Sequence, residues 1–137
     1  MSNEERNKQV VADAIAALND RDLDRFFSLH TDDTTSHEVF FPAPLERAEF
    51  REFLGEFLRA YPDARIETHA MIAEGDTVAV ENVLTATFSS RFRGQAPTGR
   101  SYTAREAVFF ELVDGRIRAA RIYLDQKSIE AQLGLDG

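Results

Sequence analysis

Apolar residues in the first half of the chain recur three and four positions apart, which is the spacing of one helical face. The first such stretch follows a capping box at Ser2 and Glu5 and ends at Asn19. A second, short helix is expected after Asp22, because aspartate caps helix N-termini well. The clearest pattern runs from Phe50 to Tyr61 and predicts a third helix.

The apolar period changes from about 3.6 to 2 at Arg65, and turn signals divide the rest of the chain. Strands joined by such short turns are antiparallel. A further short strand is expected at residues 36–41, ended by Pro42, and a last helix at residues 126–133. The four strands of the meander are expected at residues 65–73, 77–92, 101–113 and 116–125.

Helices in the first half and strands in the second predict one α+β domain over residues 1–137. We expect three helices to pack on one face of a strongly curved, mostly antiparallel sheet, because long strands usually curve. The result would be a cone-shaped α+β barrel with an internal cavity.

The amino-acid composition limits which catalytic and metal-binding groups the protein can use. The chain has no cysteine, which excludes disulfides, thiol nucleophiles and cysteine-based zinc sites. Its three histidines, His30, His37 and His69, match no metal-ligand spacing, so no metal and no other cofactor is expected. His30 extends the apolar stripe of the second helix and is expected to be packed. His37 precedes an aromatic pair and is a candidate for the cavity.

The charges argue against nucleic acid as a partner, since 16 basic and 24 acidic residues leave a net charge of −8. Residues 88–127 are locally basic, with eight basic and four acidic side chains. This local excess of positive charge is compatible with an anionic substrate, and equally with complementary charges across a dimer interface. No apolar run approaches the ~20 residues of a membrane span, and the N-terminus lacks signal-peptide character. We expect a cytoplasmic protein that binds no membrane.

The last predicted strand carries the residues best suited to catalysis. Strict alternation places Arg121, Tyr123 and Asp125 on one face with apolar neighbours such as Ile117. If this face lines the cavity, partial desolvation raises the pKa of the Asp125 carboxylic acid toward the range useful for proton transfer. Arg121 would hold a developing oxyanion, with Tyr123 or His37 as further candidates. The competing interpretation is an Arg–Asp pair on a solvated face.

The turn at Asp114-Gly115 decides which glutamate joins the face of Asp125. A two-residue loop places Glu106 there, whereas a three-residue loop places Glu111 there. The question matters because two carboxylates on one cavity wall can divide acid and base work. The sequence is compatible with both registers.

Six short motifs follow one another along the chain: Tyr61-Pro62-Asp63, Glu74-Gly75-Asp76-Thr77-Val78, Gly94 with Ala96-Pro97-Thr98-Gly99-Arg100, Asp114-Gly115-Arg116-Ile117, Arg121-x-Tyr123-x-Asp125 and Gln132-Leu133-Gly134. Together they resemble the SnoaL-like polyketide cyclase family of the nuclear transport factor 2-like and ketosteroid isomerase-like superfamily. The resemblance implies the cone-shaped fold with a cavity, often dimerising through the outer face of the sheet. It also implies that Asp125 is the acid/base residue of a cofactor-free aldol ring closure. Glu111 stands where the cyclases have a histidine.

Three functions are therefore considered. The first is a small cofactor-free enzyme for a hydrophobic, oxygenated ring compound, in which Asp125 moves a proton during cyclisation, isomerisation or hydration. Arg121, Tyr123, His37 and Glu111 would contact the substrate. The second is a non-catalytic module that binds a small hydrophobic molecule, which suits the 11 Phe and absent Trp. The third is a structural subunit of a homodimer.

Overall fold

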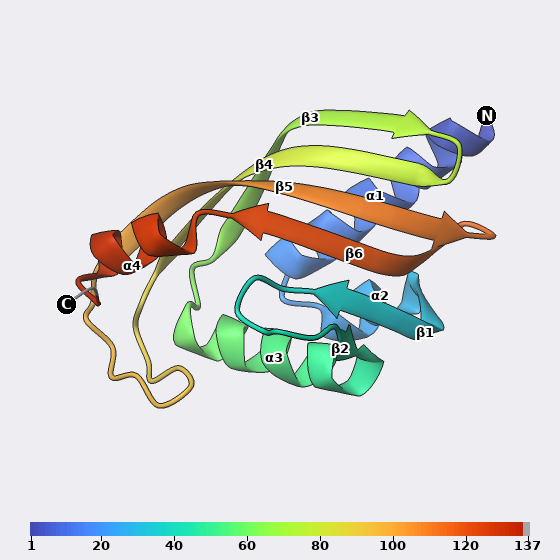
Figure 1. The fold of residues 1–137 in the computed structure, drawn as a ribbon. Helices are drawn as coiled ribbons and strands as arrows, with labels where there is room; N and C mark the ends of the chain where they lie inside the picture. Colours follow the sequence, from blue (N-terminus) through green and yellow to red (C-terminus); the bar gives the residue numbers. More distant parts are fainter. Residues whose placement is uncertain (136–137) are drawn as a thin grey trace.

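The computed structural model describes residues 1–135, and Figure 1 shows the order of its elements. The three expected helices are present as α1 (Asn3–Asn19), α2 (Leu23–Ser28) and α3 (Arg47–Ala60). The Ser2 hydroxyl caps α1, because its Oγ accepts a hydrogen bond from the Glu5 amide at 3.1 Å. The C-terminal helix α4 (Gln126–Leu133) ends at Gly134, whose φ of 76° suits glycine at a helix end.

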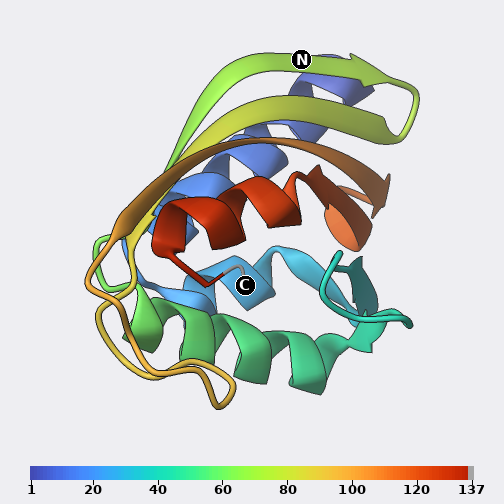
Figure 2. The ribbon, with the colours of Figure 1, turned by 60° about the vertical axis from the view of Figure 1, so that its left-hand side comes forward.

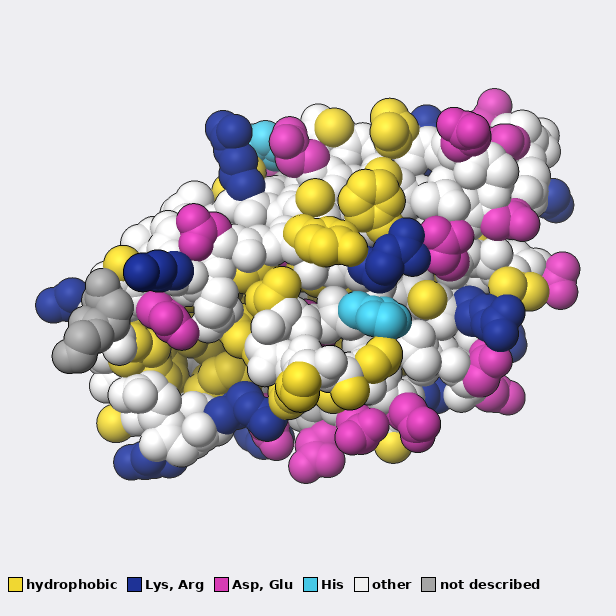
Figure 3. Space-filling model, in the orientation of Figure 1, with side chains coloured by type: hydrophobic (Ala, Val, Ile, Leu, Met, Phe, Trp, Pro, Cys, Tyr) yellow, Lys and Arg dark blue, Asp and Glu magenta, His cyan; other side chains and the backbone are white. Residues whose placement is uncertain are grey.

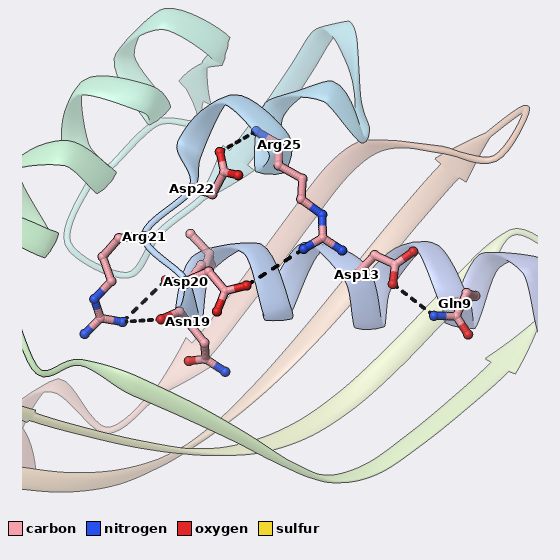
Figure 4. Close-up of polar contacts among 8 residues, drawn as sticks. Gln9, Asp13, Asn19, Asp20, Arg21, Asp22 and Arg25 are labelled. Atoms are coloured by element: carbon pink, nitrogen blue, oxygen red, sulfur yellow. Dashed lines mark hydrogen bonds and ion pairs between the residues drawn. The ribbon is translucent and has the colours of Figure 1, made fainter.

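A tight turn between α1 and α2 reverses the chain (Figure 4). Arg21 takes a left-handed conformation there, with φ of 59°, and its guanidinium donates to the Asn19 carbonyl at 2.9 Å. Asp22 then caps α2 by accepting from the Arg25 amide at 3.0 Å. The same guanidinium of Arg21 reaches the carbonyl of Pro62 at 2.6 Å, so the turn is tied to the segment that follows α3.

Six strands form one sheet in the order β2-β1-β6-β5-β4-β3. All neighbouring pairs are antiparallel except β1 and β6, which are parallel. The meander confirms the expected strands closely, and β1 and β2 extend it at one edge. The strands are β1 (His30–His37), β2 (Leu45–Glu46), β3 (Arg65–Glu74), β4 (Thr77–Thr87), β5 (Ser101–Val113) and β6 (Arg116–Leu124).

Two strand boundaries differ from the sequence-based expectation. The strand expected at residues 36–41 is instead β1, which ends at His37 because its pairing with β6 ends there, opposite Arg121. The strand expected to reach residue 92 ends at Thr87, since the amides of Ser89 and Ser90 donate to the carbonyl of Ala60 instead of continuing the ladder. Both differences arise from contacts distant in sequence. They leave two loops, residues 38–44 and 88–100, which meet where the Arg93 guanidinium lies over the Phe41 ring at 4.7 Å.

The sheet curves around the helices without closing, so the fold is an open half-barrel with β2 and β3 at its edges. Figure 2 shows the sheet arching over α1 and α3, with α4 lying across one end of the arch. Buried side chains from α1, α2 and α3 pack against the concave face and form the core. No helix among the described residues is long and apolar enough to cross a membrane.

Candidate functional site

A cavity of about 440 Å³ lies between the concave face of the sheet and the helices. Its volume is within the range of ~300–1,000 Å³ typical of small-molecule sites. The loops at residues 38–44 and 88–100 and helix α4 all supply residues to its wall. Figure 3 shows a hollow with a hydrophobic floor in this region. The cavity expected from the sequence is therefore present and accessible.

Most of the cavity wall is apolar and aromatic. Tyr61 illustrates the packing, since its ring stacks on Phe57 at 4.8 Å and on Phe88 at 5.2 Å between centroids. Burial raises the pKa of Tyr61 to about 12, so the phenol is neutral at ordinary pH. Such a wall favours a hydrophobic ring compound. Ten of the chain's aromatic rings line the cavity: Phe26, Phe40, Phe50, Phe53, Phe57, Tyr61, Phe88, Phe92, Tyr102 and Phe110.

Three carboxyl groups, those of Glu38, Glu106 and Glu130, interrupt this apolar wall, and burial raises the pKa of the first two. Glu106 lies in the middle of β5, and its Oε1 accepts a hydrogen bond from Asn82 Nδ2 at 3.1 Å. Glu38 lies in the loop after β1, and its Oε1 accepts from the Ser36 hydroxyl at 2.9 Å. Burial is the main cause that raises the pKa of Glu38 to about 7; the hydrogen bond from Ser36 opposes the rise, and the charge of Glu106 adds to it. Burial also raises the pKa of Glu106, which the hydrogen bond from Asn82 opposes.

His30 lies on the cavity wall at the start of β1 and is 2% exposed, as expected for a packed residue. Its Nδ1 lies 2.7 Å from the carbonyl oxygen of Phe26, which can only accept, so Nδ1 carries the proton. Burial, with a smaller contribution from the positive charge of Arg47, lowers the pKa of His30 to about 4. The imidazole is therefore neutral at physiological pH, and its Nε2 can accept a hydrogen bond.

The basic residues of the second half do not make the cavity basic. Among the described residues, Arg93 is the only Lys or Arg on the cavity wall. Its guanidinium is already engaged, with Glu56 at 3.3 Å and over the Phe41 ring at 4.7 Å. Within residues 1–135, no three His, Cys, Asp or Glu side chains gather as metal ligands would.

The residues singled out on the last strand lie on the other face of the sheet. Arg121 pairs with Glu111 at 3.1 Å there, and its guanidinium lies over the Phe109 ring at 5.7 Å. Tyr123 is 54% exposed on the same outer face. His37 is also exposed, paired in register with Arg121. The expectation that this face lines the cavity is wrong. Arg121 instead forms a partly solvated ion pair, as in the competing interpretation, but with Glu111 and not with Asp125.

Asp125 also lies outside the cavity, at the end of β6. Its side chain is exposed and caps α4, because Oδ1 accepts from the Ser128 amide at 3.0 Å. The residues on either side, Leu124 and Gln126, do line the cavity. A catalytic role for Asp125 stays a prediction, but its premise, a desolvated position on the cavity wall, is not met.

A β-bulge explains why alternation led to the wrong face. The turn at Asp114-Gly115 has two residues with positive φ, and next to it Leu112 pairs with Ile117. The register then shifts so that Glu111 pairs with Ala119, which leaves one β6 residue unopposed. Ile117 is therefore buried on the inner side, while the residues two and four positions further along point outward.

The bulge also resolves which glutamate faces inward. Glu111 does share the face of Arg121, but that face is the outer one. Glu106, opposite Leu124, points into the cavity. Next to the turn, Leu112 pairs with Ile117 as a two-residue loop requires. Beyond the bulge the pairing is shifted by one residue, so neither of the two expected registers describes the whole hairpin.

The sequence match agrees with this fold and cavity. Residues 8–133 match the profile of the SnoaL-like polyketide cyclase family, which is nearly the whole chain. The chain belongs to the SnoaL-like polyketide cyclase family. No curated protein matches its sequence significantly.

Solved structures of SnoaL-like and related proteins share the fold. AclR from Streptomyces galilaeus, described as a candidate hydroxylase, has a TM-score of 0.87 at 23% identity, covering 98% of this chain and 100% of its own. IdmH from Streptomyces antibioticus, described as a candidate polyketide cyclase, has a TM-score of 0.80 at 26% identity, covering 93% and 98%. An LEH-like epoxide hydrolase from M. tuberculosis has a TM-score of 0.78 at 19% identity, covering 96% and 92%.

From the sequence alone, Glu106 was one of two glutamates that could face the cavity, and neither Asn82 nor Glu38 was identified as a site residue. A usable signal was present in β4 and β5, where a single polar residue interrupts each inward-facing apolar series. Asn82 stands between Val80 and Leu84, and Glu106 stands between Ala104 and Val108. For Glu38 no periodic signal exists, because it lies in a loop.

Proposed function

We propose that the protein is a cofactor-free acid/base catalyst for an uncharged, hydrophobic, oxygenated ring compound. The observation that supports this proposal is the pair of desolvated carboxyl groups, Glu38 and Glu106, on a largely apolar cavity wall. Carboxyl groups tuned by burial toward neutral pH are the usual acids and bases of such chemistry. The family membership points to the same class of reaction.

Glu106 is the proposed base. The amide N–H of Asn82 can only donate, so it favours the ionised form of the carboxylate it contacts at 3.1 Å. Glu106 would remove a proton from carbon next to a substrate carbonyl and generate an enolate. In an aldol ring closure, the enolate carbon attacks a second carbonyl of the same molecule, and no atom is gained or lost overall.

Glu38 is the proposed acid. Its pKa of about 7 leaves much of it protonated near neutral pH, so it can donate a proton to the oxyanion that forms. Neutral His30, with a free Nε2, would accept a hydrogen bond from a substrate hydroxyl. Because the two carboxyl groups interact, they would titrate as a pair.

The charges of the cavity favour an uncharged substrate over an anionic one. Glu38, Glu106 and Glu130 lie on the wall, whereas Arg93 is already paired with Glu56. The other basic residues between positions 88 and 127 lie outside the cavity wall. A carboxylate entering the cavity would face like charges in a medium of low dielectric constant. We therefore expect 2-naphthol to raise the melting temperature and the matched anion 2-naphthoate to leave it unchanged.

Proton exchange tests the catalytic assignment. In D2O, the wild-type protein is expected to accelerate exchange of the protons next to the carbonyl of 2-tetralone, followed by NMR. Glu106→Gln should lower this rate by roughly 10²-fold or more, since that is the contribution of a general base. Asp125→Asn provides the matched comparison, because asparagine also caps helices and only the charge is lost. If Asp125→Asn abolished exchange while Glu106→Gln retained it, the assignment to Glu106 would be wrong.

A non-catalytic binding module is the second candidate. The aromatic lining favours it, since ring faces bind apolar ligands without any chemistry. Stabilisation of the protein by 2-tetralone without any accelerated exchange would support binding alone. Exchange that depends on Glu106 would exclude this alternative.

A further inference from the structure

A row of polar side chains crosses the concave face of the sheet from its edge to the cavity. Thr68 on β3 pairs in register with Asn82 on β4, which pairs with Glu106 on β5. The Thr68 hydroxyl donates to Asn82 Oδ1 at 2.8 Å, and Asn82 Nδ2 donates to Glu106 Oε1 at 3.1 Å. Three consecutive strands thus carry one continuous hydrogen-bonded row, which ends on a carboxyl group of the cavity.

The row runs from the exposed Thr68 at the sheet edge into an apolar wall around Asn82, and a local irregularity follows Thr68 on β3. On β4 the residues flanking Asn82 on this face are Val80 and Leu84, both buried. On β3 the register shifts between Thr68 and Ala70, a bulge directly after the threonine. Bulges re-aim side chains at specific positions, and this one follows the residue that contacts Asn82.

The direction of these hydrogen bonds determines what Glu106 encounters. An asparagine side chain can present either its oxygen or its nitrogen to a neighbour. Because the Thr68 hydroxyl donates to Oδ1, the nitrogen of Asn82 is the atom left to face Glu106. Asn82 is 2% exposed, so bulk water cannot replace a lost partner at low cost. The ionised carboxylate can only accept, so it favours the same orientation, and the Thr68 hydroxyl adds a second contact that holds the amide in place.

We propose that Thr68 is a positioning residue for Glu106, acting through the Asn82 side chain to keep an N–H group directed at the carboxylate. Thr68 does not line the cavity, so it acts without touching a substrate. The hydroxyl also polarises the amide, which strengthens the donation of its N–H to the carboxylate. The proposal rests on the proposed function only in treating Glu106 as the base, because the hydrogen-bonded row stands independently of any activity.

The experiment measures the pKa of Glu106 from the chemical shift of its carboxyl carbon during a pH titration by NMR. Thr68→Val removes the hydroxyl but keeps the branched shape that suits a strand. We expect the pKa of Glu106 to rise by roughly half a unit or more, the order expected for a weakened hydrogen bond to a carboxylate. Thr68→Ser, which restores the hydroxyl, should return the pKa to near the wild-type value. The side-chain amide signals of Asn82 should shift in Thr68→Val and recover in Thr68→Ser.

Thr85→Val is the matched control, because Thr85 is exposed on the neighbouring strand β4 and pairs with Arg65 on β3. This variant should leave the pKa of Glu106 unchanged. Two results would overturn the proposal: an unchanged pKa in Thr68→Val, or a Thr68→Ser variant that behaves like Thr68→Val. If Thr68→Val fails to fold, Thr68→Ala compared with Thr68→Ser makes the same test.

The titration needs no substrate, so its outcome is separate from that of the exchange assay. A shifted pKa in Thr68→Val with full exchange activity in Glu106→Gln would reject the proposed base and keep the positioning role. An unchanged pKa in Thr68→Val together with lost exchange activity in Glu106→Gln would reject the positioning role and keep Glu106 as the base. Where exchange is observed, the acid limb of its pH profile should move upward in Thr68→Val by the same amount as the pKa.

Discussion

Replacing Glu38 by glutamine is expected to stabilise the protein at neutral pH and to change little at acidic pH. Burial is the main cause that raises the pKa of Glu38 from 4.5 to about 7. A pKa unit corresponds to about 1.4 kcal/mol, so ionising Glu38 costs on the order of 3 kcal/mol more in the folded protein than in the unfolded chain. Glutamine avoids this cost and retains an oxygen to accept the Ser36 hydroxyl.

The sign of the pH dependence follows from proton binding. Between pH 4.5 and about 7 the folded protein keeps a proton on Glu38 that the unfolded chain has released. The free energy of unfolding therefore falls as the pH rises through this window. Below pH 4.5 both states hold the proton, so the contribution of Glu38 to stability is fully present there.

Urea denaturation from about pH 4 to about pH 8, at constant ionic strength, measures this effect. The difference in unfolding free energy between Glu38→Gln and wild type should grow by roughly 2 to 3 kcal/mol across the range. Glu81→Gln is the control, since Glu81 is exposed on β4, and its difference from wild type should stay flat. If the unfolding free energies of Glu38→Gln and wild type ran parallel against pH, the conclusion that burial disfavours the charged form of Glu38 would be refuted.

Three further predictions concern the cap, the cavity wall and the outer face. Asp125→Ala should lower the free energy of unfolding by about 1 kcal/mol through loss of the α4 cap, whereas Asp125→Asn should not; equal urea midpoints for both would contradict the capping role. Phe88→Leu, at a ring that is 1% exposed, should cost about 1 to 2 kcal/mol in the same assay, and no loss would mean that the ring is loosely packed. The homodimer through the outer face predicts a dimer mass by sedimentation equilibrium and a monomer mass for Tyr123→Asp, because the rings of Tyr123 and Phe109 are in contact and exposed there. A wild-type monomer would reject it.

Helices and strands could be predicted because their signals are local. The apolar spacing before Tyr61 and the alternation after Arg65 correspond to α1, α3 and the meander with boundaries off by a few residues. The larger errors fall where a distant partner decides the backbone. β1 starts at His30 because it pairs with β6, more than 80 residues further along the chain. Ser89 and Ser90 leave the sheet because they donate to Ala60.

The candidate site was less predictable, because alternation defines two faces of a strand without saying which one is buried. Ile117 and Arg121 have the same parity, and only the bulge between them places the first inside and the second outside. A single residue inserted in one strand thus moves every later side chain to the other face. Glu38 had no periodic signal at all, since loop position is set by what surrounds it.

The sequence by itself determined that this chain forms helices followed by a curved sheet, and that no thiol takes part in any catalysis, because cysteine is absent. Only the tertiary structure decided which carboxyl groups are removed from water. Asp125 and Glu111 face solvent, whereas Glu38 and Glu106 enter the cavity. The physical reason is that desolvation depends on the packing of whole elements against each other, and that packing depends on a register shift and a loop path that no local pattern encodes.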